Sequence, residues 1–257
     1  FADNKFSNSI NMSGVNSINW VRIVAQTVYY FFSYFQICQL NEKINFSVPT
    51  GNFGDVYAGY LSKKMGLPID KLIVATNQND ILHRAISNGQ YKAHSVVETL
   101  SPSMDIQVAS NFERLIYDIN DQNTDKTSKI MQSIKNEKKY LIEEKELKKI
   151  KKDFVSETIS EQELLSCIKK VYENYKIIID PHTAVGLGAL KKINLAGKSV
   201  VLSTAHPCKF PEAIKKAINI KSELPDNLNY ILSKKENFIV MNNDIEEVKK
   251  YILNKLI

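Results

Sequence analysis

Hydrophobic and polar residues follow one another in blocks whose periods predict alternating helices and strands. Residues 17–40 carry apolar side chains at helical spacing and predict a long helix, with Ser17 or Asn19 as its N-cap. Short apolar runs without that period predict buried strands at 44–48, 71–76 and 199–204. Further helices are expected at 55–65, 80–89, the end of 101–119, 180–193 and just after 210. This order predicts an α/β fold in which helices cover a parallel sheet.

The pattern changes between residues 120 and 176, where charged residues dominate and neither glycine nor proline occurs. This stretch predicts two or three helices at the surface. We therefore expect residues 1–119 and 177–257 to form one large α/β lobe, with 120–176 as a peripheral helical insertion. A short strand near 238–241 and a terminal helix should close the chain.

Composition excludes several classes of protein. A chain of 257 residues that is 44% hydrophobic can bury a sizeable core. The net charge of +6 comes mostly from lysines that interleave with glutamates, as in "KELKKIKKDF", which predicts solvated helix faces. A basic nucleic-acid-binding protein should instead combine clustered Lys and Arg with exposed aromatic residues, and here the aromatic residues concentrate in 20–35.

Targeting signals and cysteine spacing point to a cytoplasmic protein. No apolar run reaches membrane-spanning length, and no signal peptide opens the chain. Cys38, Cys167 and Cys208 lie far apart without CxxC spacing, which favours reduced thiols over disulfides or a metal site. Because the chain starts with Phe1 in the middle of a polar stretch, we expect it to be part of a longer polypeptide.

A glycine turn at 48–55, "VPTGNFGD", is the strongest candidate for a binding site. Gly51 and Gly54 follow a predicted strand and precede a helix, so the backbone can approach a ligand and the free N–H groups of the helix suit a phosphate. The side chain of Asn52 can donate a further N–H. The turn lacks both the GxGxxG spacing and the P-loop lysine. From these residues alone, a phosphate cradle and an ordinary strand–helix connection remain equally open.

Other polar residues give weaker signals. None of the histidines has metal-ligand spacing, which indicates polar or capping roles for His83, His94, His182 and His206. His206 and Cys208 form a candidate thiol–imidazole pair, but no orienting carboxylate lies nearby in the sequence. Asp105 and Asp180 are expected to cap helices.

Six stretches resemble one enzyme family in the same order and at similar intervals. They are "VNSINWVRIVAQTVYYF", "VPTGNFGDVYAGYLSKKMGLP", "LIVATNQND", "SPSMDIQVASNFERL", "DPHTAVG" and "LSTAHPCKF", and together they resemble threonine synthase. The resemblance covers nearly the whole chain and is least specific in 120–175. It implies the tryptophan-synthase-β-like fold of pyridoxal-phosphate enzymes, with much of the larger lobe present here.

The resemblance implies a cofactor site. The loop that holds the phosphate of pyridoxal 5'-phosphate corresponds to Gly51, Asn52, Phe53, Gly54 and Asp55. Thr204 corresponds to the hydroxyl residue that bonds the pyridine nitrogen. From spacing alone, the Thr204 hydroxyl would be assigned to a strand and satisfied by backbone.

The resemblance also implies a substrate and a reaction. The family converts O-phospho-L-homoserine and water into L-threonine and phosphate. Asn16, Ser17 and Arg22 correspond to the clamp on the substrate's phosphate, where an arginine fork matches phosphate geometry. From the residues alone, Arg22 could also be a surface arginine whose stem lies along an apolar helix, although its place within an otherwise apolar run disfavours that alternative. No partner other than the small substrate is implied, neither nucleic acid nor membrane, and a monomer is favoured.

One departure from the family limits this interpretation. The Schiff-base lysine of the family sits in a "TSGDTG"-like motif, and no such motif occurs in residues 1–257. The catalytic residue is therefore expected upstream, and this stretch alone is expected to be inactive. Three alternatives remain open: another pyridoxal-phosphate lyase of the same fold, a catalytically inactive homologue, and a basic nucleic-acid-binding protein.

Overall fold

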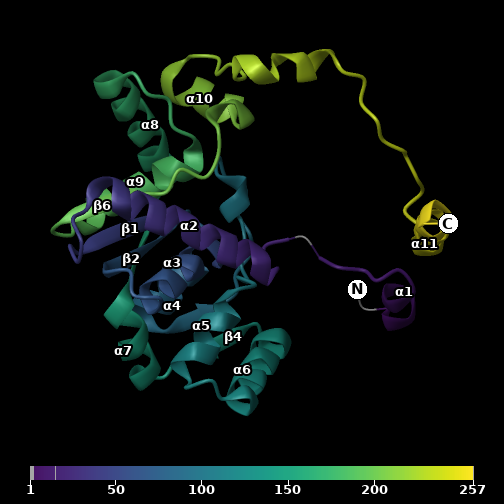
Figure 1. Cartoon of the computed structure of the whole chain (residues 1–257), viewed down its shortest axis with the longest axis horizontal. Coiled ribbons are helices and arrows are strands. Elements are labelled where there is room, and N and C mark those ends of the chain that lie inside the picture. Colours follow the sequence, from purple (N-terminus) through teal and green to yellow (C-terminus); the bar gives the residue numbers. More distant parts are fainter. Residues whose placement is uncertain (1–2, 15, 257) are drawn as a thin grey trace. The chain divides into compact units, whose positions relative to one another are not determined.

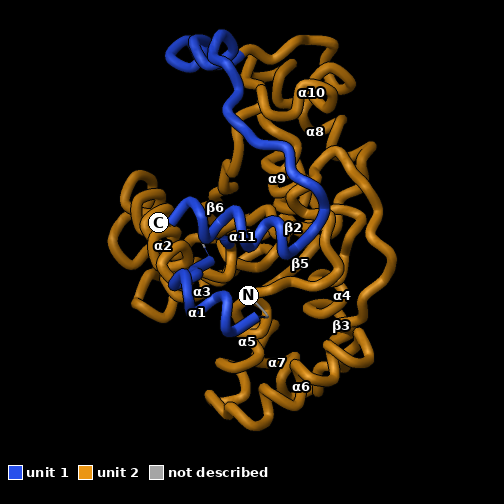
Figure 2. Tube along the Cα trace, turned by 90° about the vertical axis from the view of Figure 1, so that its right-hand side faces the viewer, with its two compact units in different colours: residues 1–16, 224–257 blue, residues 17–223 orange. Residues whose placement is uncertain are grey.

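The computed structural model describes residues 3–14 and 16–256 and divides the chain into two compact units (Figure 2). Unit 1 combines the chain ends, Phe1–Asn16 and Leu224–Ile257, and unit 2 is Ser17–Glu223. Among the helices of the described residues, none is both long enough and apolar enough to cross a membrane.

A four-stranded parallel sheet forms the centre of unit 2 (Figure 1). Its strands stand in the order β5, β2, β1, β6, with bounds Phe154–Thr158, Ile69–Thr76, Ile44–Pro49 and Lys198–Val201. Every residue of β1 is buried, as expected for a central strand covered on both faces. The predicted α/β fold and its three predicted strands are confirmed.

Helices cover both faces of this sheet. Along β2, Leu72 and Val74 belong to one hydrophobic cluster, whereas Ile73 and Ala75 belong to another, because successive strand residues point to opposite faces. The helices of unit 2 are α2 (Trp20–Ile37), α3 (Gly54–Lys64), α4 (Ile81–Asn88), α5 (Phe112–Ile119), α6 (Thr124–Glu137), α7 (Glu144–Asp153), α8 (Glu161–Tyr175), α9 (Pro181–Ile193) and α10 (Pro211–Ile218). Short 3₁₀ turns occur at η1 (Pro102–Met104) and η2 (Pro207–Lys209).

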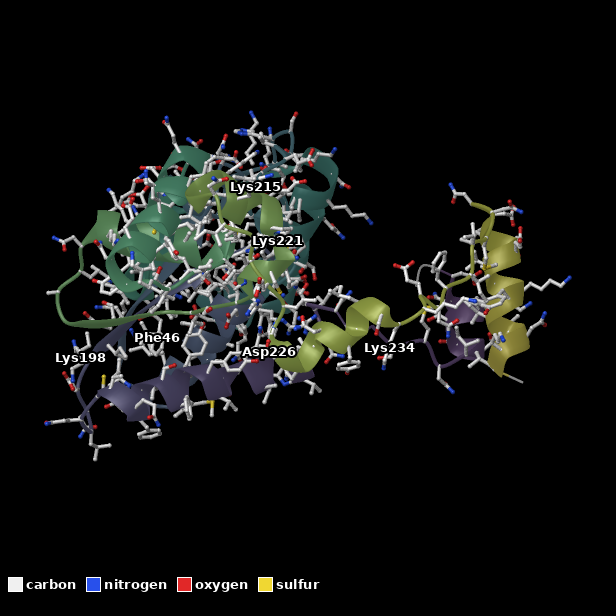
Figure 3. All side chains as sticks on the ribbon, turned by 90° about the horizontal axis from the view of Figure 1, so that it is seen from above. Phe46, Lys198, Lys215, Lys221, Asp226 and Lys234 are labelled. Carbon is white, nitrogen blue, oxygen red and sulfur yellow. The ribbon has the colours of Figure 1, made fainter. Side chains whose placement is uncertain are left out.

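The long helix α2 packs closely over α3 and the sheet. Asn19 is its N-cap, because its side chain accepts a hydrogen bond from the Val21 N–H at 2.9 Å. The buried ring of Tyr30 lies 4.8 Å from that of Phe46, which sits among the packed side chains of unit 2 (Figure 3). The Tyr30–Phe46 contact thus holds the middle of α2 against the sheet.

The segment 120–176 differs from its prediction. It contains three helices, but residues 154–158 form β5, which pairs in parallel with β2 at the edge of the sheet. Residues 139–141 form β4, which pairs antiparallel with β3 (Gln90–Lys92). The expectation of a wholly helical, peripheral segment is therefore wrong for β5, a five-residue strand that no glycine or proline marks off from the charged helices around it. The division into a lobe and an insertion stays a prediction.

Unit 1 contains α1 (Asn4–Ser9), η3 (Asp226–Ser233) and α11 (Ile245–Leu256). The Lys249 ammonium on α11 lies 2.7 Å from the Asp3 carboxylate that caps α1, so the two ends of the chain meet. The terminal helix is confirmed. The strand expected near 238–241 is wrong, because that apolar run is exposed and has no regular structure.

Candidate functional site

A pocket of about 170 Å³ lies where β1 ends and α3 begins. In the sheet β1 stands between β2 and β6. The chain runs from β1 through α3 to β2 on one side, whereas β6 on the other side comes from much later in the sequence. Open α/β sheets bind ligands at the carboxyl ends of strands at such a point. The pocket is lined by Ser17, Arg22, Gln26, Pro49, Thr50, Gly51, Asn52, Phe53, Gly54, Asp55, Val56 and Ser103.

The glycine turn includes backbone angles that residues other than glycine rarely adopt. Phe53, which precedes the first residue of α3, has φ +66° and ψ 7°, a left-handed conformation that is unfavourable for a bulky side chain. Its buried ring packs at 5.3 Å on Phe112 and at 5.8 Å on Phe154, which holds this conformation in place. A Cβ on Gly51 would lie 2.5 Å from the Ser103 carbonyl oxygen, so only glycine fits there.

In this conformation, successive backbone N–H groups of the turn have no acceptor among the described residues. In residues 3–14 and 16–256, no N–H group from Gly51 to Asp55 donates a hydrogen bond to another residue. Nor does the side-chain N–H₂ group of Asn52, whose oxygen lies 3.5 Å from the Ser110 nitrogen. Consecutive unpaired N–H groups at a helix N-terminus form a binding site for an anion such as a phosphate. The pocket therefore fits the phosphate of a cofactor or substrate.

A cation lines the same pocket. Arg22 lies in the first turn of α2, and its guanidinium makes no ion pair or hydrogen bond with any residue that the structure describes. Ser17 precedes the helix and lines the pocket as well. The structure thus brings Ser17 and Arg22 together with the glycine turn. Asn16 is an exposed residue of unit 1, and its role stays a prediction.

Asp55 lines the same pocket as Arg22, and the pKa of its carboxyl group is raised. Burial raises the pKa of its carboxyl group from 3.8 to about 6, although a hydrogen bond from the Tyr30 hydroxyl opposes the shift. The same hydroxyl also donates to the Asp55 carbonyl oxygen at 2.7 Å. Below about pH 6 this side chain is therefore mostly protonated, which reduces its repulsion of an anion in the pocket.

Thr204 lies in a second pocket of about 400 Å³ that shares Gln26 and Asp55 with the first. It follows the end of β6, and its hydroxyl makes no hydrogen bond to a described residue. The alternative of a strand hydroxyl satisfied by backbone therefore does not hold. A hydroxyl in this position can bond a ligand that extends from the cradle into the neighbouring pocket.

Ser103, which lines the pocket, is held by residues for which the sequence predicted only capping or polar roles. The Ser103 N–H donates to His182 Nε2 at 3.2 Å, so His182 carries its proton on Nδ1 and donates to Asp180 at 3.1 Å. Burial opposes ionisation of Asp180, but hydrogen bonds from His182 and Thr183 outweigh it and keep the pKa of Asp180 below its usual range. In the sequence, these residues stood out only because "SPSMD" and "DPHTAVG" belong to the six stretches that resemble the family in order.

The smaller predictions have mixed outcomes. Asp180 caps α9 as expected, because its side chain accepts from the His182 N–H. The expectation for Asp105 is wrong: its carboxylate accepts from the side chains of Asn77, Asn79 and Thr99 and caps no helix. Asn77 and Asn79 lie 28 and 26 positions before Asp105, and sequence spacing cannot reveal contacts over such separations.

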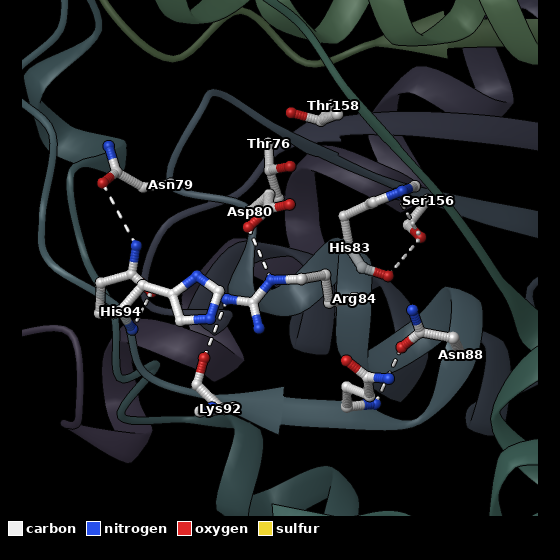
Figure 4. Close-up of polar contacts among 12 residues, drawn as sticks. Thr76, Asn79, Asp80, His83, Arg84, Asn88, Lys92, His94, Ser156 and Thr158 are labelled. Carbon is white, nitrogen blue, oxygen red and sulfur yellow. Dashed lines mark hydrogen bonds and ion pairs between the residues drawn. The ribbon is translucent and has the colours of Figure 1, made fainter. Parts of the chain in front are cut away.

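The histidines serve local contacts. His206 accepts from the Cys208 N–H at 3.2 Å and caps η2, as predicted. His83 on α4 has its Nδ1 3.1 Å from the Ser156 hydroxyl on β5 (Figure 4). No group of three or more metal-ligating side chains with suitable geometry occurs among the described residues. All three cysteines are free.

Comparison with known proteins gives a consistent result. Residues 183–252 match the family "Threonine synthase, C-terminal". The threonine synthase of Pseudomonas aeruginosa is 42% identical over 98% of this chain and 54% of its own length, and that of Saccharomyces cerevisiae is 41% identical over 100% and 55%.

Solved structures agree with the sequence matches. A PLP-bound threonine synthase from Brucella melitensis superposes with a TM-score of 0.95 at 41% identity, over 99% of this chain and 55% of that one. The yeast threonine synthase gives a TM-score of 0.90 at 39% identity, over 100% and 56%. The chain thus spans about half the length of the relatives it matches. The resemblance found in the sequence is confirmed: this chain is similar to threonine synthases over about half of their length, and residues 183–252 match the C-terminal region of that family.

Proposed function

We propose that this chain is part of a threonine synthase that converts O-phospho-L-homoserine and water into L-threonine and phosphate for threonine biosynthesis. The Schiff-base lysine lies outside residues 1–257, in the complete polypeptide, and these residues alone are inactive. One observation carries the proposal: the five consecutive N–H groups of Gly51 to Asp55 share a pocket with the Arg22 guanidinium, and none of these donors has a partner in the part of the chain that the structure describes. Such a site recognises a phosphate.

The cofactor in this proposal is pyridoxal 5'-phosphate, the ligand named for the Brucella structure. When bound, it supplies an electron sink for the negative charge that forms next to the substrate's amino group. The backbone N–H groups of 51–55 would hold its phosphate. Thr204 would bond its ring nitrogen with a neutral hydroxyl, which would not force that nitrogen to stay protonated.

The substrate's phosphate is assigned to Arg22 with Ser17 and Asn16. A guanidinium can hold two phosphate oxygens at once and stabilises the charge on the departing phosphate. Because Arg22 has no carboxylate partner in the described residues, it need not break an ion pair to bind the substrate. Asp55, when protonated, adds no second negative charge beside these phosphates.

The test measures turnover by the complete polypeptide. It should show the absorbance of a bound pyridoxal-phosphate Schiff base and release phosphate from O-phosphohomoserine with formation of threonine. Serine and threonine serve as control substrates, because another lyase of the same fold would act on them without phosphate release. An enzyme that binds the cofactor but yields no threonine would contradict the proposed reaction and support the inactive homologue.

The 257-residue chain gives an independent test of the cradle. Inorganic phosphate or sulfate should shift the amide NMR signals of residues 52–55. A well-ordered loop that never responds would contradict the assignment. A cytoplasmic location and a monomeric state are also part of the proposal, and cell fractionation and sedimentation test them.

A further inference from the structure

One stretch of the sequence, "SNFER" at 110–114, has no role in the proposed function so far, yet it touches both phosphate-contacting segments. Asn111 lies at the N-terminal end of α5 and is completely buried. Its Nδ2 donates to the Ser17 carbonyl oxygen at 2.8 Å and to the Asn52 carbonyl oxygen at 3.1 Å. Its backbone N–H also donates to the Asn52 oxygen at 3.0 Å. One residue thus joins the entry of α2 to the glycine turn.

These bonds fix the direction of a peptide group in the cradle. In a trans peptide the C=O and N–H bonds point in opposite directions. Since Asn111 holds the Asn52 carbonyl oxygen twice, the following N–H, that of Phe53, points away from Asn111. Phe53 is also the residue in the left-handed conformation, which persists only where the surroundings impose it. Asn111 and the ring of Phe112 provide those surroundings.

Arg114, one turn along α5, supports Asn111 and the entry of α2. Its Nε donates to Asn111 Oδ1 at 3.0 Å, which orients the Asn111 amide so that Nδ2 faces the two carbonyls. Its Nη2 donates to the Ile18 carbonyl oxygen at 2.8 Å, and its guanidinium lies 5.2 Å from the centre of the Trp20 ring. Arg114 therefore holds the residues that lead directly into the turn of Arg22.

We propose that Asn111 and Arg114 are positioning residues that hold the two phosphate-binding segments, 17–22 and 51–55, in register with each other. Asn111 bonds both segments, whereas Arg114 bonds only the first segment and Asn111. Loss of Asn111 should therefore weaken cofactor and substrate binding together. Loss of the Arg114 fork should weaken mainly substrate binding, because the Asn111 backbone N–H still holds the Asn52 carbonyl oxygen. This inference rests on the proposed function for its substrate readout but not for its cofactor readout.

The experiment compares three variants of the complete enzyme: Asn111→Ala, Arg114→Lys and Asn120→Ala. The last is a matched control, because Asn120 is also a buried asparagine next to α5, and its Nδ2 donates to the Ile116 carbonyl oxygen at 2.9 Å, away from the pocket. Each variant is measured for pyridoxal-phosphate Kd, for KM and kcat with O-phosphohomoserine, and for melting temperature.

Asn111→Ala should raise the cofactor Kd and the KM by roughly tenfold each, as expected for losing one or two hydrogen bonds that orient a site. Its kcat at saturation should change by less than about threefold, because Asn111 touches no reacting group. Arg114→Lys should raise KM by roughly threefold to tenfold and leave the cofactor Kd within about twofold. Asn120→Ala should lower only the melting temperature.

The inference is overturned if Asn111→Ala resembles Asn120→Ala, with reduced stability and unchanged Kd and KM. It is also overturned if Arg114→Lys leaves KM unchanged, a result that stays informative if Asn111→Ala fails to fold. If the unaltered enzyme binds pyridoxal phosphate but does not act on O-phosphohomoserine, the proposed function fails. In that case the cofactor Kd of Asn111→Ala alone still decides whether Asn111 positions the cradle.

Discussion

Replacing Arg22 by alanine in the complete enzyme should damage substrate use and spare both folding and the cofactor. The guanidinium is exposed and has no hydrogen-bond or ion-pair partner among the described residues, so its removal breaks no polar contact and should change the free energy of unfolding by less than about 0.5 kcal/mol. Loss of a charge-assisted, bidentate bond to the substrate's phosphate costs about 2–4 kcal/mol of transition-state stabilisation. We therefore expect kcat/KM to fall by roughly 30-fold to 1000-fold.

The assay combines phosphate release from O-phosphohomoserine with the Schiff-base absorbance of the bound cofactor. The absorbance of Arg22→Ala should match that of the unaltered enzyme, and Arg22→Lys should recover only part of the activity, because a point charge cannot form the fork. The pocket places Arg22 next to the glycine turn, so the two phosphates could be assigned the other way round. A variant that loses its pyridoxal phosphate, yet shows normal kcat/KM once reconstituted, would refute the assignment made here.

Four further substitutions test the pocket and its supports. Gly51→Ala should raise the pyridoxal-phosphate Kd by more than about tenfold, since its Cβ would lie 2.5 Å from the Ser103 oxygen; Gly54→Ala, with 3.3 Å to Asn111 Nδ2, should have a smaller effect in the same titration. Asp55→Asn should increase the unfolding free energy above pH 6 by up to about 3 kcal/mol, as measured by urea denaturation at pH 3–8. Burial raises the pKa of Asp55 from 3.8 to about 6, so its favourable contribution is complete below pH 3.8 and is lost as the pH rises to 6; an unchanged pH profile would contradict this. Gly59→Ala should lower the unfolding free energy by about 1–3 kcal/mol, because its Cβ would lie 2.6 Å from the Tyr30 ring; equal urea midpoints would show that α2 can move away.

The sequence predicts those helices, strands and turns that a local pattern of residues is enough to identify. Helix α2, strands β1 and β2, and the turn between β1 and α3 follow from apolar period and glycine position, which act over a few residues. Strand β5 was missed because its identity depends on pairing with β2, more than 80 residues earlier along the chain. The apolar run at 238–241 was taken for a strand, but no strand pairs with it in the structure of the described residues.

In the candidate site, too, local features could be predicted and contacts between distant segments could not. The cradle at 51–55 could be predicted because its donors belong to the backbone of one short segment. The contacts of Asn111 with Ser17 and Asn52 could not, because they join loops separated by 94 and 59 positions. Asp105 shows the same limit, since its partners lie on other loops.

A cradle made of peptide groups changes which mutations can remove it. Side chains at 52 and 55 can vary during evolution without removing the donors, because every residue except proline carries an N–H group. Affinity for phosphate should therefore outlast enzymatic activity in a lineage that loses its catalytic lysine. Substitutions that redirect the main chain, such as those at Gly51, are the ones that would erase it. Retained phosphate binding in a distant descendant would accordingly indicate shared ancestry of the loop rather than retained catalysis.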